Sequence, residues 1–82
     1  MAHAITTTQA NHLCQSIVLW QRTEVHDSWS WRTIWFEGFW YPGSSAAVML
    51  VLTVYHDRKP ATCSLFDHDG ETLWKGLQSD LD

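Results

Sequence analysis

An aromatic run, WSWRTIWFEGFWY at positions 29–41, dominates the sequence and holds four of its six tryptophans. Aromatic and β-branched residues at this density are typical of a β-strand. In a strand, alternate residues point to opposite faces, and here both faces would carry large apolar side chains. A chain of 82 residues can cover one such face with its own helix but has little material left for the second. The run therefore suggests a surface that meets a partner.

The N-terminal part of the chain has hydrophobic residues at helix spacing: Ala10, Leu13, Cys14, Ile17 and Val18. With threonines at 6–8 as candidate N-caps, this spacing predicts a helix over about 8–22. The β-prone sequence SIVLW favours a rival interpretation, in which a strand begins at Ser16.

Four stretches of the sequence predict strands, at 29–41, 46–56, 62–66 and 71–75. Turn-forming residues separate them, with PGSS at 42–45, DRKP at 57–60 and DHDG at 67–70. Short turns between successive strands favour an antiparallel meander. The predicted fold is a single α+β domain over residues 1–82, with one N-terminal helix packed on a four-stranded antiparallel meander sheet.

Pairing Tyr41 with Ala46 gives a trial register for the sheet. It predicts one face with Trp31, Trp35, Phe39, Val48, Leu50, Leu52, Val54, Cys63, Leu65 and Leu73. It predicts an opposite face with Ile34, Phe36, Trp40, Met49, Val51, Tyr55, Phe66 and Trp74. One helix can bury one of these sets, so the other would be an exposed apolar patch. A slip of one residue would exchange the faces of a strand.

Charge is distributed unevenly along the chain. Residues 1–66 hold four acids and four bases, so the net charge of −4 resides in residues 67–82. There, Lys75 is the one base among these acids: Asp67, Asp69, Glu71, Asp80 and Asp82. Phosphate binding needs clustered Lys and Arg, so this balance argues against direct nucleic-acid binding. It favours a protein partner with a basic surface.

The sequence has neither a signal-peptide pattern nor an apolar run of about 18 residues that could span a membrane. We therefore expect no membrane partner and a cytoplasmic location. Two cysteines, Cys14 and Cys63, are too few for a disulfide scaffold and are expected to be reduced and buried, although one bridge between them remains open.

Catalytic and metal-binding motifs are weak. His56, Cys63 and His68 could supply three ligands to a metal, but no C-x-x-C or H-E-x-x-H spacing supports such a site. The four glycines stand alone, so nothing resembles a phosphate-cradling loop, and there is no nucleophile elbow. We expect no cofactor and no enzymatic activity.

The aromatic residues near strand ends are the best candidates for an interface, because an indole there can bury its ring and keep its N–H at a wet rim. The predicted partner-binding anchors are Trp29, Trp31, Arg32, Trp40 and Tyr41. Trp20 and Trp74 are expected to pack at the ends of elements, and Trp35 is expected in the core.

The sequence thus predicts a small interaction protein that inhibits or modulates a partner by covering its surface. The acids at 67–82 would steer it toward that partner. In size and composition the chain resembles the inhibitors that phages and mobile elements make against host defence complexes, including anti-CRISPR proteins. Two alternatives remain open: an obligate homodimer joined through the second apolar set, and a small metal- or ligand-binding protein that uses His56, Cys63 and His68.

Overall fold

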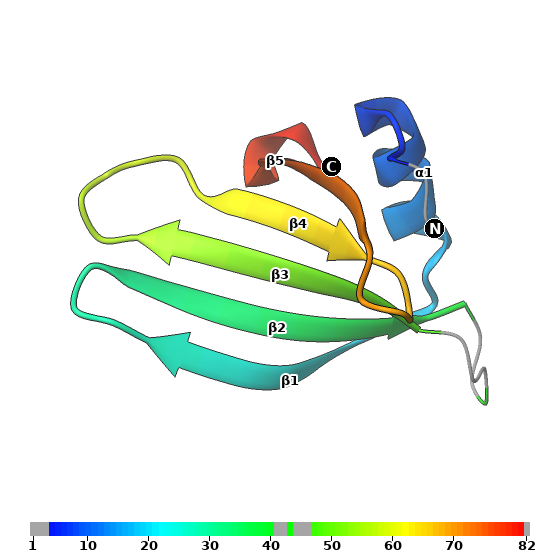
Figure 1. Cartoon of the computed structure of the whole chain (residues 1–82), viewed down its shortest axis with the longest axis horizontal. Helices are drawn as coiled ribbons and strands as arrows, with labels where there is room; N and C mark the ends of the chain where they lie inside the picture. The colour runs from blue at the N-terminus through cyan, green and yellow to red at the C-terminus, as the bar shows by residue number, and fades with distance from the viewer. Residues whose placement is uncertain (1–3, 41–42, 44–46, 82) are drawn as a thin grey trace.

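The computed structural model describes residues 4–40, 43 and 47–81, and in this part of the chain one α-helix accompanies a five-stranded antiparallel sheet (Figure 1). The strands follow one another across the sheet in chain order. The elements are α1 (Thr7–Ser16), β1 (Leu19–Asp27), β2 (Trp31–Phe39), β3 (Ala47–Tyr55), β4 (Thr62–Phe66), β5 (Thr72–Leu77) and a 3-10 turn, η1 (Gln78–Asp80). The predicted α+β class and antiparallel meander are confirmed.

The sheet has five strands rather than the predicted four, because the segment predicted as the second half of a helix forms β1. The helix ends at Ser16, and Ile17 already has an extended backbone with φ −75° and ψ 123°. From Leu19 onward the chain pairs with β2 along nearly its whole length. Pairing with a long neighbouring strand thus decides the conformation of residues that are compatible with either helix or strand. The alternative prediction, in which a strand begins at Ser16, was closer to the structure than the longer helix.

Helix α1 begins with a capping box that satisfies two backbone groups. The Thr6 hydroxyl accepts a 3.2 Å hydrogen bond from the backbone N–H of Gln9, and the Gln9 side chain accepts a 2.8 Å bond from the backbone N–H of Thr6. These bonds fix the start of a helix that is only 10 residues long and would be marginal in isolation.

Replacing Thr6 by alanine is expected to lower the free energy of unfolding by about 1 kcal/mol, because the N-terminal N–H groups lose their side-chain acceptor. Urea denaturation followed by circular dichroism measures this change. Thr8→Ala is the matched control, since Thr8 is an exposed residue inside the helix. Equal destabilisation by the two variants would contradict a capping role for Thr6.

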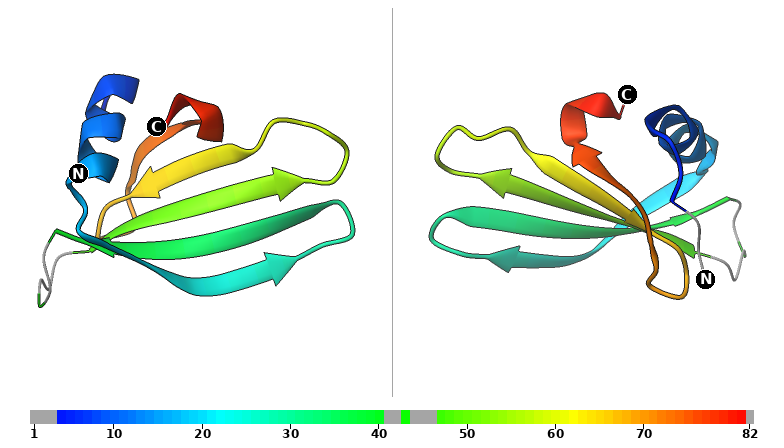
Figure 2. Two further views of the ribbon diagram at one scale, coloured as in Figure 1. Left: turned by 180° about the vertical axis from the view of Figure 1, so that it is seen from behind. Right: turned by 45° about the horizontal axis from the view of Figure 1, so that its top comes forward.

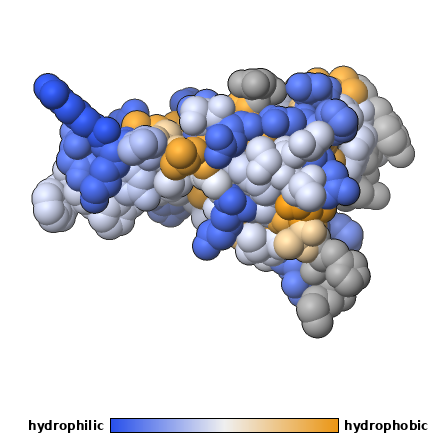
Figure 3. Space-filling model, turned by 90° about the horizontal axis from the view of Figure 1, so that it is seen from above, coloured by the Kyte–Doolittle hydropathy of each residue, from blue (hydrophilic) through white to orange (hydrophobic). Residues whose placement is uncertain are grey.

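The two faces of the sheet differ in what covers them, and we name them the inner face and the outer face. Helix α1 and η1 both lie on the inner face (Figure 2). The register aligns Phe36, Leu50, Leu65 and Trp74 in one row across β2 to β5 on this inner face. Seen from the side of α1 and η1, hydrophobic residues reach the surface as separate spots among hydrophilic ones (Figure 3).

The core lies between α1 and one end of the inner face. Its buried residues are Ala10, Ile17, Val48, Cys63, Leu65 and Trp74. Three hydrogen bonds join the N-terminal segment to β5 and η1: Ile5 N–H to the Leu73 carbonyl at 2.9 Å, Trp74 Nε1 to the Thr7 hydroxyl at 3.2 Å, and Asn11 Nδ2 to the Asp80 carbonyl at 2.9 Å. Segments far apart in the sequence therefore hold the core together.

The observed register differs from the trial register by one residue between β2 and β3. Phe39 pairs with Ala47, not with Val48. As a result Ile34 and Phe36 join Val48, Leu50 and Leu52 on the inner face. Trp31, Trp35 and Phe39 share the outer face with Met49, Val51, Tyr55 and Phe66. Trp74 pairs with Leu65 and replaces Leu73 on the inner face. A slip of one residue reverses every side chain of a strand, so this single difference in register accounts for the exchange of faces.

No helix in the described segments has the length and apolar character needed to cross a membrane.

Candidate protein-binding surface

The outer face of the sheet carries a continuous set of large side chains that no described element covers. Along β2 and β3 its members are Trp31, Thr33, Trp35, Glu37, Phe39, Met49, Val51, Thr53 and Tyr55. None of these side chains is fully buried, whereas the inner face buries Val48, Cys63, Leu65 and Trp74. The difference follows from the single helix, which lies entirely on the inner side (Figure 2).

Trp35 and Phe66 form the centre of the outer face. Their ring centroids are 6.3 Å apart and the ring planes differ by 15°, so the rings are stacked. The two residues come from β2 and β4, which stand roughly 10 Å apart because β3 lies between them. The side chains therefore lean toward each other above β3. Each ring is half-buried by the other, which leaves a flat aromatic platform open to a partner.

Hydroxyl groups line the outer face toward the turn that joins β3 to β4. The Thr33 and Thr53 hydroxyls are 3.4 Å apart, and the Tyr55 hydroxyl is 3.4 Å from that of Thr62. Lys59 in this turn places its ammonium 5.8 Å from the centre of the Tyr55 ring. The outer face is thus apolar in the middle and polar at this end, as interfaces with a polar rim are.

Glu37 places a carboxylate inside the aromatic set. It lies on β2 between Trp35 and Phe39 and faces Gln21 on β1 and Met49 on β3. The side chain is half-buried, and no hydrogen bond or ion pair joins it to another residue of the described segments. A carboxylate in such a position favours a cationic group brought by a second molecule, since burial without a partner is costly.

Trp29 and Trp31 lie at the β1–β2 end of the sheet. Trp29 sits in the connecting turn and is 93% exposed, which makes it the most exposed large hydrophobic residue described. Trp31 begins β2 on the outer face, opposite Tyr55, and is 42% exposed. Trp31 therefore extends the aromatic platform to the edge of the sheet.

Arg32 points to the inner face and is engaged locally. Its Nε donates to the Asp27 carboxylate at 2.6 Å, and this hydrogen bond lowers the pKa of the Asp27 carboxyl. Both side chains are more than half exposed, so the pair adds little to stability. Arg32 and Trp31 thus face opposite sides of the sheet and cannot contact one flat partner together.

Trp40 follows the last residue of β2 and is 37% exposed. The nine steps along the chain from Trp31 to Trp40 span roughly 30 Å of extended backbone, so the two ends of the run form separate sites. Tyr41 lies outside the described residues. The predicted anchors are therefore not one cluster, and Trp35, Phe39 and Phe66 fill the surface between them.

The predicted acidic residues are divided between the two ends of β5. Asp67, Asp69 and Glu71 belong to the β4–β5 turn, while Asp80 lies in η1. The Asp67 carboxylate accepts hydrogen bonds from the backbone N–H groups of Asp69 at 3.0 Å and Glu71 at 2.9 Å, so its role is to close the turn. Asp69 lies 3.5 Å from His68. Asp82 is outside the described residues.

The alternative metal site is not assembled. His56 lies in the turn before β4 and His68 in the turn after it, at opposite ends of that strand, while Cys63 points into the core. Among the described residues no group of three His, Cys, Asp or Glu side chains is placed to hold a metal ion. A trial register that paired Cys63 with Val54 put His56 diagonal to Cys63, but Cys63 pairs with Leu52, and β3 ends at Tyr55.

Sequence reasoning missed three central residues of the outer face: Trp35, Glu37 and Phe66. Trp35 was expected in the core and lies on the outer face because of the one-residue register difference. Glu37 gave a signal that could have been used, since it is the one acid inside the aromatic run at 29–41.

Comparison of the chain with protein-family models, with curated proteins and with solved structures gives no match.

Proposed function

We propose that this protein is a protein-binding module that contacts its partner through the outer face of its sheet. The observation that carries this proposal is the outer face itself. Three neighbouring strands, β2 to β4, present Trp31, Trp35, Met49, Val51 and Phe66 on one side, and no described residue of that side is fully buried. A contiguous exposed apolar surface of this kind is typical of an interaction site.

The partner surface that fits is apolar with a Lys or Arg near its centre. Trp35 and Phe66 offer a flat aromatic area, and rigid aromatic residues of this type dominate binding energy at interfaces. Glu37, beside Trp35, would pair with the partner's cation inside the contact. Charge complementarity of this kind selects against partners that lack the cation.

The activity we infer is inhibition or modulation by covering the partner's functional surface. A partner covered by the outer face would lose access to whatever that surface normally binds, so occupation alone is sufficient for this activity. The acidic residues of the β4–β5 turn, Asp67, Asp69 and Glu71, follow Phe66 in the chain and would speed association with a basic partner. The resemblance to phage and mobile-element inhibitors of defence complexes is in keeping with this activity.

Two neighbouring residues of β3 provide a matched test. Val51 faces outward and Leu52 faces inward, and both are half-buried, so Val51→Lys and Leu52→Lys make comparable changes on opposite faces. We expect N-terminally tagged wild-type protein and Leu52→Lys to capture the same protein from a lysate of the source organism or its host. Val51→Lys should capture it at least tenfold less, because the new ammonium would be desolvated in the contact.

Mass spectrometry identifies the captured protein, and circular dichroism confirms that both variants are folded. We also expect Glu37→Gln to weaken capture and to reduce its sensitivity to salt, because one charge pair is lost. Equal capture by wild type and Val51→Lys, or loss with Leu52→Lys alone, would refute the outer face as the binding surface.

A second copy of the chain is the rival occupant of the outer face, and it would make the protein a homodimer. Such a contact would bury two Glu37 carboxylates, one from each copy, and burial of these charges without cationic partners would oppose association. Light scattering over a range of concentrations separates the two assemblies. Twice the monomer mass, lost in Val51→Lys, would assign the outer face to self-association.

A further inference from the structure

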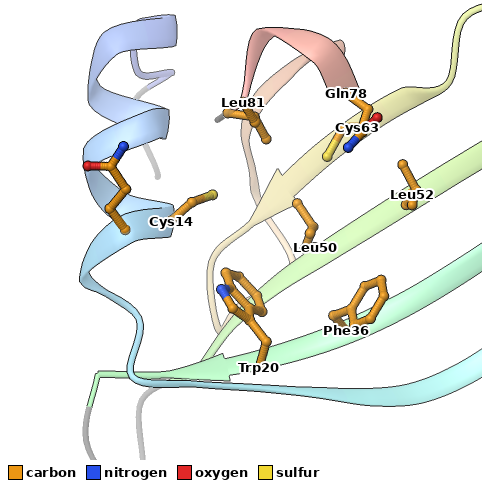
Figure 4. Close-up of a pocket in the computed structure, with 9 residues that line it drawn as sticks. Cys14, Trp20, Phe36, Leu50, Leu52, Cys63, Gln78 and Leu81 are labelled. Carbon is orange, nitrogen blue, oxygen red and sulfur yellow. The ribbon is translucent and has the colours of Figure 1, made fainter.

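A cavity of about 460 Å³ opens on the inner face, between α1, η1 and the strands β1 to β4 (Figure 4). It lies on the opposite side of the sheet from the proposed partner surface. The apolar side chains of Trp20, Phe36, Leu50 and Leu52 form its floor along the sheet, and Leu81 closes it from the C-terminal side. Cavities of roughly 300–1,000 Å³ with mainly apolar walls are the usual sites for small ligands.

Trp20 shapes one wall of the cavity because Gly38 lies next to it on β2. A Cβ atom at Gly38 would come within 2.6 Å of Cζ3 of the Trp20 indole and 2.8 Å of Cγ2 of Ile17. Glycine at this position therefore lets the indole lie down against the sheet instead of standing out from it. The wall is thus built from a specific pair of residues on neighbouring strands.

The lining of the cavity is uncharged. No Asp, Glu, Lys, Arg or His is among the described residues that line it. Its two thiols are those of Cys14, on α1, and Cys63, on β4. Burial raises the pKa of both thiols, and that of Cys63 reaches about 11, so both are protonated at neutral pH. An ionised ligand group would find no counter-charge here.

Two residues with side-chain amides line the cavity, Gln15 on α1 and Gln78 in η1, and we assign the orientation of a ligand to Gln78. The side chain of Gln78, from η1, lies next to Cys63 at the edge of the cavity (Figure 4). The side-chain amide of Gln78 makes no hydrogen bond to another residue of the described segments. An amide can both donate and accept, so it suits a hydroxyl, a carbonyl or an amide on the ligand.

We propose that this cavity binds an uncharged, mainly apolar small molecule with a single hydrogen-bonding group that meets Gln78. The ligand would lie against Trp20, Phe36, Leu50 and Leu52, with its polar end toward η1. This site is independent of the proposed partner surface, because the two lie on opposite faces of one sheet.

Titration with N-phenyl-1-naphthylamine, an uncharged dye whose fluorescence rises in apolar sites, tests the proposal. We expect saturable binding of one dye per chain. Two competitors of equal chain length then report on charge. We expect 1-decanol to displace the dye at a concentration at least tenfold lower than decanoate, because the carboxylate would have to be desolvated without a partner. Equal potency of decanol and decanoate would refute an uncharged site.

The β3 variants locate the dye. We expect Leu52→Lys to abolish dye binding and Val51→Lys to leave it unchanged, the reverse of their effects on partner capture. Cys14→Phe fills the cavity from α1 without adding charge, so it should also weaken dye binding. This variant replaces Leu52→Lys in the test if Leu52→Lys does not fold. Loss of dye binding with Val51→Lys alone would place the dye on the outer face and refute the cavity as its site. Absence of dye binding to folded wild-type protein would also refute the cavity site. Neither result bears on whether the outer face binds a protein partner.

Discussion

Replacing Trp74 by alanine is expected to remove about 3–5 kcal/mol from the free energy of unfolding. Trp74 is 7% exposed and pairs with the fully buried Leu65 on the inner face. Its Nε1 also donates a 3.2 Å hydrogen bond to the Thr7 hydroxyl, so the indole joins β5 to α1. Domains of this size are stable by only about 5–15 kcal/mol, so this single change should remove a large share of the total stability.

Urea denaturation followed by circular dichroism measures the loss. Trp29→Ala is the matched control, because Trp29 is 93% exposed and its removal should change stability by less than about 0.5 kcal/mol. Trp74→Phe separates the contribution of apolar burial from that of the hydrogen bond, since phenylalanine keeps most of the apolar volume but cannot donate to Thr7. Similar losses for Trp74→Ala and Trp29→Ala would contradict the role of Trp74 as a core residue.

The Cys63 thiol is expected to react with iodoacetamide at pH 7.5 at least 100-fold more slowly in the folded protein than in the urea-unfolded chain. Burial, with a smaller effect of Cys14, raises the pKa of Cys63 from the ordinary 9.0 to about 11. The thiolate is the reactive form, so this shift alone lowers its population about 100-fold at neutral pH. Cys63 is also only 3% exposed.

Alkylation of the Cys14→Ser variant, followed by mass spectrometry, isolates the reaction of Cys63. Cys14 in a Cys63→Ser variant should react at an intermediate rate, because its pKa is also raised but its side chain is half-buried. Reaction of Cys63 at the unfolded rate in protein that is folded by circular dichroism would mean that β4 is open in solution.

The same thiol makes stability depend on pH. The unfolded chain releases the Cys63 proton near pH 9, whereas the folded chain holds it until about pH 11. The folded state therefore binds more protons between these values, and stability should fall as pH rises through this range. Urea denaturation at pH 8 and pH 10.5 measures the fall, and Cys63→Ala should show a smaller one. An equal fall in both proteins would assign it to other groups.

Local signals in the sequence were enough to predict most of the elements. The strand predicted at 62–66 has the bounds of β4, and the Pro-Gly, DRKP and DHDG signals all fall in connections between strands. The helix begins close to the predicted residue because threonine capping is a local interaction. Turn and cap chemistry acts over three or four residues, so it can be read without knowledge of the fold.

Interactions across the sheet could not be predicted in the same way. Residues 17–22 are compatible with helix or strand, and β2 as a neighbour decides between them. The bulge between Arg22 and Glu24 has no clear sequence signal either. The register of β2 against β3 depends on the connection between them, where one residue more or less exchanges the faces.

Local signals can be predicted from the sequence and interactions across the sheet cannot, and this difference explains why the candidate site was predicted only in part. An apolar sheet face that a single helix leaves uncovered was expected from the composition, but the trial register grouped Trp31 with residues of the inner face such as Val48 and Leu65. Which tryptophan faces outward depends on the register, so Trp35 was assigned to the core although it lies on the outer face. The separation of Trp31 from Trp40 follows from the length of β2 and was overlooked.

The bonds from the N-terminal segment to β5 and η1 also determine the order of assembly during synthesis. Helix α1 leaves the ribosome first, but the groups it docks against, at Leu73, Trp74 and Asp80, are among the last described residues to be made. The hairpins of β1 to β4 are local and can form meanwhile. Until β5 arrives, the nascent sheet exposes apolar side chains on both faces, so this interval is when the chain is most prone to aggregate and most in need of a chaperone.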